Sequence, residues 1–85
     1  MRATKNSQDK LQGILKSLGF VIRYERGNFR GGHCIVMEEQ MIIINKFFPL
    51  ESKITTLMAI IQDIEVDESL LSDDQKNIVH KLKSE

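Results

Sequence analysis

The sequence predicts an α+β domain with the order α-β-β-β-α-α, in which helices pack on a three-stranded antiparallel sheet. Two observations predict this class. Residues 33–37 and 41–45 are apolar runs separated by a short polar break, which is typical of a β-hairpin. Segments nearer both ends of the chain instead carry apolar residues at helical spacing.

The first element is expected to be a helix. Residues 1–6 are expected to be a frayed terminus, and residues 7–85 a single α+β domain. Asn6 or Ser7 can cap a helix that has apolar residues at positions 11, 14, 15 and 18, on one face. Gly19 follows in the position that favours left-handed backbone. We expect this helix to cover one face of the sheet.

A first strand is predicted over residues 20–25, because apolar and polar side chains alternate there. Phe20, Ile22 and Tyr24 share one side, whereas Val21, Arg23 and Glu25 share the other. This alternation is cleaner than that of the hairpin, so the strand is placed nearer an edge of the sheet.

The hairpin is apolar on both faces. Ile42 and Ile44 point to one side of the second hairpin strand, and Met41 and Ile43 point to the other. A small antiparallel sheet normally leaves one face to water, so this hairpin needs cover on both sides. The cover is expected to be helices, a second copy of the chain, or both.

Two helices are predicted after the hairpin. Pro49 opens the first, whose apolar residues fill an arc of roughly 160° at 100° per residue. So wide an arc suits a helix that touches the sheet and also a neighbouring helix or a partner chain. Ser72 and Gln75 form a capping box, which predicts a last helix from about residue 73 to residue 83.

The 85 residues carry no net formal charge, yet the charge is unevenly distributed. Residues 1–32 hold seven basic and two acidic side chains, giving +5, and residues 33–85 hold five basic and ten acidic ones, giving −5. One interpretation is a solvated surface with charges sorted by chance. The other is association between identical copies, steered by their opposite patches. Neither half is basic enough to make nucleic acid the default partner.

The composition also indicates the cellular compartment in which the protein is expected. The single cysteine excludes an internal disulfide and agrees with a reducing environment. No apolar segment approaches the length that spans a bilayer, and the polar first residues lack the core of a signal peptide. We therefore expect a cytoplasmic protein with no membrane partner.

The sequence offers no recognisable catalytic, metal or cofactor motif. His33 and Cys34 are neighbours on a strand, so their side chains point to opposite faces and cannot readily share one substrate atom or metal ion. Cys34 is expected to be a small buried hydrophobe and His33 a surface or partly satisfied side chain. The paired carboxylates fall in turns and caps, where solvated acids belong. We expect no enzyme, no metal and no cofactor.

One basic constellation could bind an anion or a single-stranded nucleic acid. Its candidate residues are Arg23, Arg26, Arg30 and His33, in and around the Arg/Gly-rich loop between the first two strands. The simpler interpretation is a solvated loop with Phe29 folded onto the core.

The hypothesis that the sequence favours is a non-enzymatic domain that acts through protein–protein contacts as a homodimer. It depends on the two-faced hairpin, the broad apolar arc after Pro49 and the charge split. Of Phe47 and Phe48, at least one ring should enter the core, and if the other stays exposed it would mark a contact surface. The candidate interface residues are Ile35, Met37, Met41, Ile43, Phe47, Met58 and Ile60.

Residues 30–64 resemble the core of the zincin-like metallopeptidases. In that family a hairpin ends in a strand like Ile42-Ile43-Ile44-Asn45 and leads into a helix with the motif His-Glu-x-x-His. Here the five motif positions hold Ala59, Ile60, Ile61, Gln62 and Asp63, so the resemblance implies neither zinc nor peptidase activity. The whole chain is also similar to a family of small uncharacterised bacterial proteins, which implies no activity.

Overall fold

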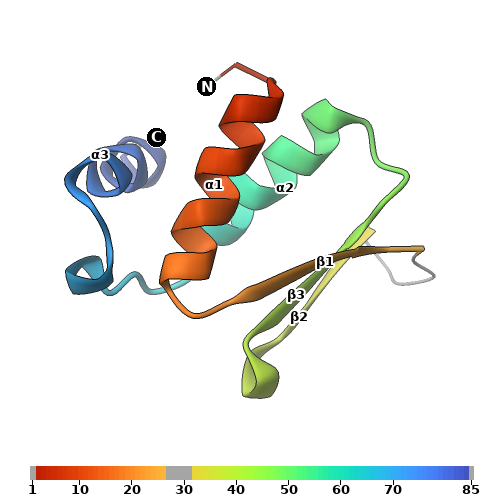
Figure 1. Cartoon of the computed structure of the whole chain (residues 1–85), viewed down its shortest axis with the longest axis horizontal. Coiled ribbons are helices and arrows are strands. Elements are labelled where there is room, and N and C mark those ends of the chain that lie inside the picture. Colours follow the sequence, from red (N-terminus) through yellow and green to blue (C-terminus); the bar gives the residue numbers. More distant parts are fainter. Residues whose placement is uncertain (1, 27–31, 85) are drawn as a thin grey trace.

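The structure is a computed structural model and describes residues 2–26 and 32–84. Figure 1 shows the elements along the chain: α1 (Lys5–Ser17), β1 (Val21–Glu25), β2 (His33–Val36), β3 (Met41–Asn45), α2 (Leu50–Asp63) and α3 (Asp73–Lys83). Two short 3-10 turns, η2 (Met37–Glu39) and η3 (Glu68–Leu70), lie before β3 and before α3. The α+β class is confirmed. The predicted loop residues Phe29 and Arg30 lie outside the described residues.

The sheet is mixed, so the prediction of an antiparallel sheet is wrong for β1. The strand order is β1-β3-β2, with β1 parallel to β3 and β2 antiparallel to it. The reason lies in β3, whose Ile42 and Ile44 have no exposed surface. This most apolar strand takes the centre, where it is paired on both sides, and the more polar β1 and β2 take the edges.

The register sorts the side chains of all three strands onto two faces. Ile22 and Tyr24 of β1 lie beside Ile42 and Ile44 of β3, which also lie beside Ile35 and His33 of β2. This face is covered by α1 and α2, as Figure 1 shows. The predicted split of the first strand into two sides is confirmed.

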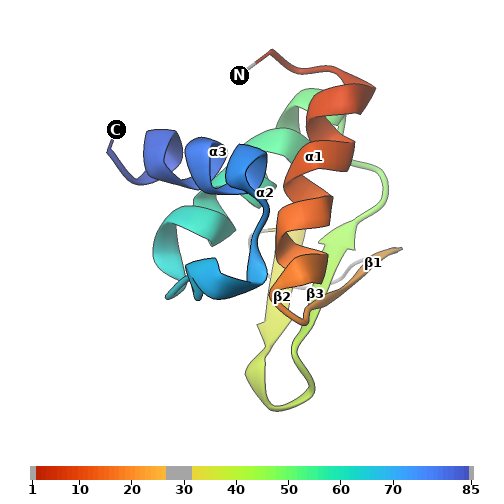
Figure 2. The same cartoon turned by 60° about the vertical axis from the view of Figure 1, so that its left-hand side comes forward.

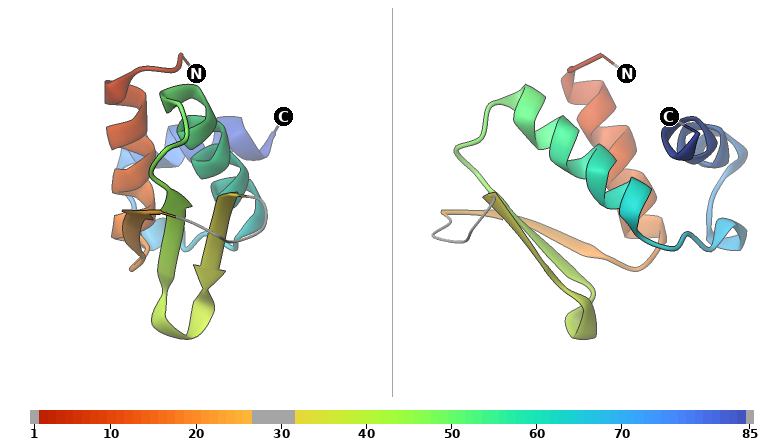
Figure 3. Two further views of the ribbon diagram at one scale, coloured as in Figure 1. Left: turned by 90° about the vertical axis from the view of Figure 1, so that its right-hand side faces the viewer. Right: turned by 180° about the vertical axis from the view of Figure 1, so that it is seen from behind.

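The helices form two further layers on the covered side of the sheet. In Figure 3 the helices gather on one side, and no described helix or strand covers the other side. α3 lies against α2, farther from the sheet, and crosses the direction of α1 (Figure 2). The core between the layers is formed by residues from α1, β3, α2 and α3, with Leu11, Ile14, Leu15, Ile42, Ile44, Leu57, Ile61 and Val79 fully buried.

The first helix begins earlier than the sequence suggested. The cap is Thr4, whose Oγ1 accepts a hydrogen bond from the backbone N–H of Ser7 at 3.1 Å. The expectation of a cap at Asn6 or Ser7 is therefore wrong, and the segment expected to be frayed contains the start of α1. Gly19 follows the helix with φ of 97°, which confirms the predicted left-handed position.

The apolar arc of α2 finds its partners inside the chain. α2 packs against α1 and α3, and its Leu57 and Ile61 are fully buried. The capping box of α3 is confirmed, because Ser72 Oγ accepts from the N–H of Gln75 and the Gln75 side chain accepts from the N–H of Ser72. The arc therefore gives no reason to expect a partner chain at α2.

Gly32 allows the ring of Phe48 to close over the start of β2. Its φ is 80°, and a Cβ at this position would overlap the Phe48 ring. An added side chain would thus be strained by its backbone angle and would also displace an aromatic ring that packs against the core.

We predict that Gly32→Ala lowers the free energy of unfolding by about 2 to 4 kcal/mol, from the overlap and the left-handed backbone together. The matched control is Gly13→Ala in α1, where a Cβ would lie 3.8 Å from its nearest neighbour, Gln75 Nε2. Gly13→Ala should raise the free energy of unfolding by up to about 1 kcal/mol, because alanine favours the helix. Urea denaturation measures both, and equal effects would contradict this role of Gly32.

Candidate interaction surface

The face of the sheet opposite the helices carries alternate side chains from all three strands. We call it the open face. The register places Met41, Ile43 and Asn45 of β3 beside Val21, Arg23 and Glu25 of β1, and beside Val36 and Cys34 of β2. No helix or strand in the described part of the chain covers these residues.

The middle of the open face is apolar. Val21 is 54% exposed, and Cys34 is exposed beside Ile43. Met41 and Ile43 are half-buried, although no described helix or strand lies over them. A solvated sheet face normally carries polar side chains, so the contiguous apolar residues make this face a candidate contact surface. The expectation that Cys34 would be buried is wrong, because no helix or strand among the described residues covers this face.

The open face also contains an ion pair, between Arg23 and Glu25. Arg23 Nε lies 2.8 Å from a carboxylate oxygen of Glu25, two residues farther along β1. Both side chains keep about half of their surface exposed, so the pair contributes at most about 1 kcal/mol. Its main effect is that this part of the open face has no net charge.

Basic side chains and an exposed aromatic ring gather where β1 and β3 end. We call Arg26, Lys46 and Phe47 the basic end. The guanidinium carbon of Arg26 lies 5.8 Å from the centroid of the Phe47 ring, and Lys46 Nζ lies 5.2 Å from it. Phe47 is 63% exposed. Parallel pairing brings these residues together, since the N–H of Lys46 donates to the carbonyl of Glu25 at 2.9 Å.

The opposite end of the hairpin is acidic. We call Met37, Glu38 and Glu39 of η2 the acidic end. All three are exposed, with Met37 at 60%. On the helix side of the sheet, Met37 also lines a hollow of about 530 Å³, whose other lining residues include Leu18, Phe20 and the carboxylate-bearing Asp63, Glu65 and Asp67. The molecule thus presents a sulfur-containing apolar side chain among acids at one end and an aromatic ring among bases at the other.

The four predicted anion-binding residues do not converge. Arg23 lies on the open face and is paired with Glu25. Arg26 stacks on Phe47 at the basic end. His33 lies beside Ile44, on the face that the helices cover. Arg30 is outside the described residues.

The seven predicted interface residues divide into three groups. Met41 and Ile43 lie on the open face, whereas Met37 lies in the turn before β3 and Phe47 lies just after β3. Ile35 and Met58 are half-buried against the core, and Ile60 is 2% exposed. Phe48 packs against the core, which confirms that at least one of the paired rings does so, and Phe47 is exposed. The sequence did not identify Val21 and Cys34 as members of this surface. Their alternation along the strands was apparent, but it does not tell which face of the sheet the helices cover.

The structure brings no metal-binding constellation together in residues 2–26 and 32–84, where no three His, Cys, Asp or Glu side chains could hold an ion. His33 and Cys34 point to opposite faces, as predicted. The positions that would carry the zincin motif lie in α2, where Ile60 and Ile61 are buried and Gln62 donates to the carbonyl of Leu82 at 2.9 Å.

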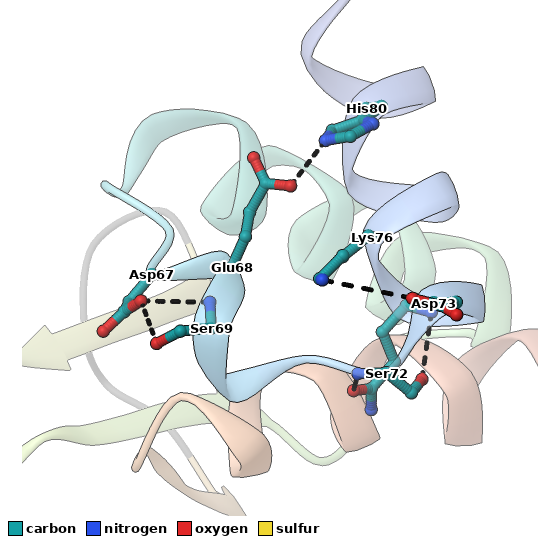
Figure 4. Close-up of polar contacts among 8 residues, drawn as sticks. Asp67, Glu68, Ser69, Ser72, Asp73, Lys76 and His80 are labelled. Carbon is teal, nitrogen blue, oxygen red and sulfur yellow. Dashed lines mark hydrogen bonds and ion pairs between the residues drawn. The ribbon is translucent and has the colours of Figure 1, made fainter.

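Polar contacts around η3 fix α3 rather than form a site (Figure 4). Two hydrogen bonds from Ser69, first from its hydroxyl and then from its N–H, hold the pKa of Asp67 below its ordinary value. His80 Nε2 lies 2.7 Å from a carboxylate oxygen of Glu68, which joins α3 to the turn before it. These groups are exposed and each already has a partner.

A second pocket of about 540 Å³ lies between α1 and α3, with Asp9, Lys10, Asp74 and Asn77 among its lining residues. These four side chains are exposed and belong to two helix surfaces, with acids and a base mixed. The pocket shows neither a buried carboxylate nor converging cations, and we assign it no function.

Comparison with protein-family models, with curated proteins and with solved structures gave no match for this chain. Among the described residues, no helix has the length and apolar character needed to cross a bilayer. The candidate surface is therefore interpreted from its own chemistry.

Hydrogen bonds of Tyr24 connect β1 to α1 on the covered face of the sheet. Its hydroxyl accepts a hydrogen bond from Gln8 Nε2 at 2.9 Å and donates one to Gln12 Oε1. Burial raises the pKa of the Tyr24 hydroxyl above its ordinary value of 10.0, and the hydrogen bond from Gln8 offsets part of this rise. The folded state therefore favours the neutral phenol.

We predict that alkaline pH destabilises the fold through Tyr24. Because the folded-state pKa is the higher one, this stability is fully present below about pH 10 and is lost as pH rises through the folded-state pKa. Denaturation of the wild type and of Tyr24→Phe at about pH 8 and about pH 11 measures the effect.

Tyr24→Phe should be less stable by about 1 to 3 kcal/mol near neutrality, because buried Gln8 loses its partner. The variant should also lose less stability than the wild type between the two pH values. An equal loss in both proteins would show that Tyr24 is not the group responsible.

Proposed function

We propose that this protein acts through protein–protein contacts and forms a homodimer through its open face. The observation that carries the proposal is the contiguous apolar strip formed by Val21, Cys34, Val36, Met41 and Ile43 on the side of the sheet that no described element covers. Exposed apolar surface of this kind gains free energy when a partner removes it from water.

A second copy of the chain is the occupant that the charges favour. The strands of the open face end at the basic end on one side and at the acidic end on the other, while the Arg23–Glu25 ion pair on β1 is internally neutral. An interface between identical copies must be complementary to itself, and opposite charges at opposite ends provide that property.

The expected dimer is weak. Two strands of five residues and one of four, spaced about 4.8 Å apart, give a flat footprint of roughly 220 Å². A standard interface buries about 800 Å² on each partner. The strip alone falls well short of this area, so the ends must add to the contact, and dissociation at micromolar concentrations is expected.

We predict that sedimentation of the wild type shows a reversible monomer–dimer equilibrium. Ile43→Lys should shift it to monomer at every concentration, because a charge would be placed at the centre of the strip without entering the core. The matched control is Thr55→Lys, on an exposed part of α2 away from the sheet, which should dimerise like the wild type.

Cys34 gives a readout in the unmodified chain, because it is the only cysteine and lies exposed on the open face. Its alkylation should slow as protein concentration rises through the dimer range. A wild type that stays monomeric at high micromolar concentration, with a constant alkylation rate, would overturn the proposed function.

A further inference from the structure

We infer the arrangement of the two copies, an inference that depends on the proposed dimer. The open faces stack with their strands antiparallel, across a two-fold axis that passes near Ile43. The basic end of each copy then docks on the acidic end of the other. Arg26 and Lys46 approach Glu38 and Glu39 of the second copy.

The basic end adds exposed apolar surface to the contact. Its Phe47 ring is 63% exposed, with Arg26 and Lys46 beside it. Of the four large apolar side chains that are most exposed in the described residues, this arrangement buries Val21 and Phe47. It does not bury Met37, because that side chain lines a hollow on the helix side of the sheet with Leu18, Phe20 and Ile64.

The position of the ends along β3 fits a two-fold axis at its middle residue. Ile43 is the third of the five residues of β3, with η2 just before the strand and the basic end just after it. An axis near Ile43 places a residue three or four positions after it over one three or four positions before it. Lys46 and Phe47 therefore fall over Gln40 and Glu39 of the second copy.

The other face-to-face arrangement is unfavourable. An axis parallel to the strands would place basic end on basic end and acidic end on acidic end, which like-charge repulsion opposes. The antiparallel arrangement stacks β1 on the β1 of the second copy and brings the two Arg23 side chains near each other. Each Arg23 is already neutralised by Glu25 at 2.8 Å, so this contact adds little repulsion.

The experiment reverses the charges of each end in turn. Glu38→Lys with Glu39→Lys makes both ends basic, and Arg26→Glu with Lys46→Glu makes both ends acidic. All four positions are exposed, so each variant should fold, which circular dichroism checks. Each variant alone should dimerise at least about tenfold more weakly than the wild type, because like charges then meet at both ends.

Two combinations should restore association. An equimolar mixture of the two variants should form heterodimers of about wild-type affinity, since every end then meets its opposite. A single chain with all four reversals should recover as well, because its ends are exchanged and still complementary. Under the strand-parallel arrangement, the four-fold variant would gain nothing over the wild type, and neither pair of reversals would weaken association.

Salt gives a measurement that needs no variant. Wild-type dimerisation should weaken as salt rises, because the attraction between ends is screened, whereas self-association of either reversed variant should strengthen. Wild-type affinity that is unchanged by salt, with reversed variants equal to the wild type, would overturn this arrangement and leave the dimer intact. A wild type that is monomeric throughout would overturn the dimer itself.

Discussion

The structure depends on the burial of Ile42 and Ile44 between the sheet and the two helices above it. These side chains have no exposed surface, and they fix β3 as the strand that must be paired on both edges. β1 then joins β3 in parallel, and β2 joins it as the hairpin partner. A change of one residue in the register of β3 would turn both isoleucines outward, so this burial also determines which side chains form the open face.

The same burial creates the candidate surface. Only one face of the sheet can meet α1 and α2, and α3 packs against α2 farther from the sheet. The described helices and strands therefore leave Met41 and Ile43 uncovered, although these residues lie on the same strand as the two core isoleucines. Parallel pairing of β1 and β3 has a second consequence, because it gathers Arg26 with Lys46 and Phe47 at one end, opposite the acids of η2.

Local signals were predicted well where the interaction is between near neighbours in sequence. The capping box of Ser72 and Gln75 and the left-handed Gly19 each depend on residues within a few positions. Errors arose where local alternatives are nearly equal in energy or where the outcome depends on distant contacts. Thr4 caps α1 in place of Asn6 or Ser7, and the broad arc of α2 is filled by the chain's own helices rather than by a partner.

The sequence alone determined the helices, the hairpin and the two-sided character of each strand, because these follow from periodicity over a few residues. It also showed that β3 is apolar on both faces. Only the tertiary structure decided which face is covered, that β1 pairs with β3, and that Cys34 is exposed while Ile60 is not. The reason is that alternation divides a strand into two sides but does not say which side meets a helix. That choice is made by packing between segments far apart in the chain.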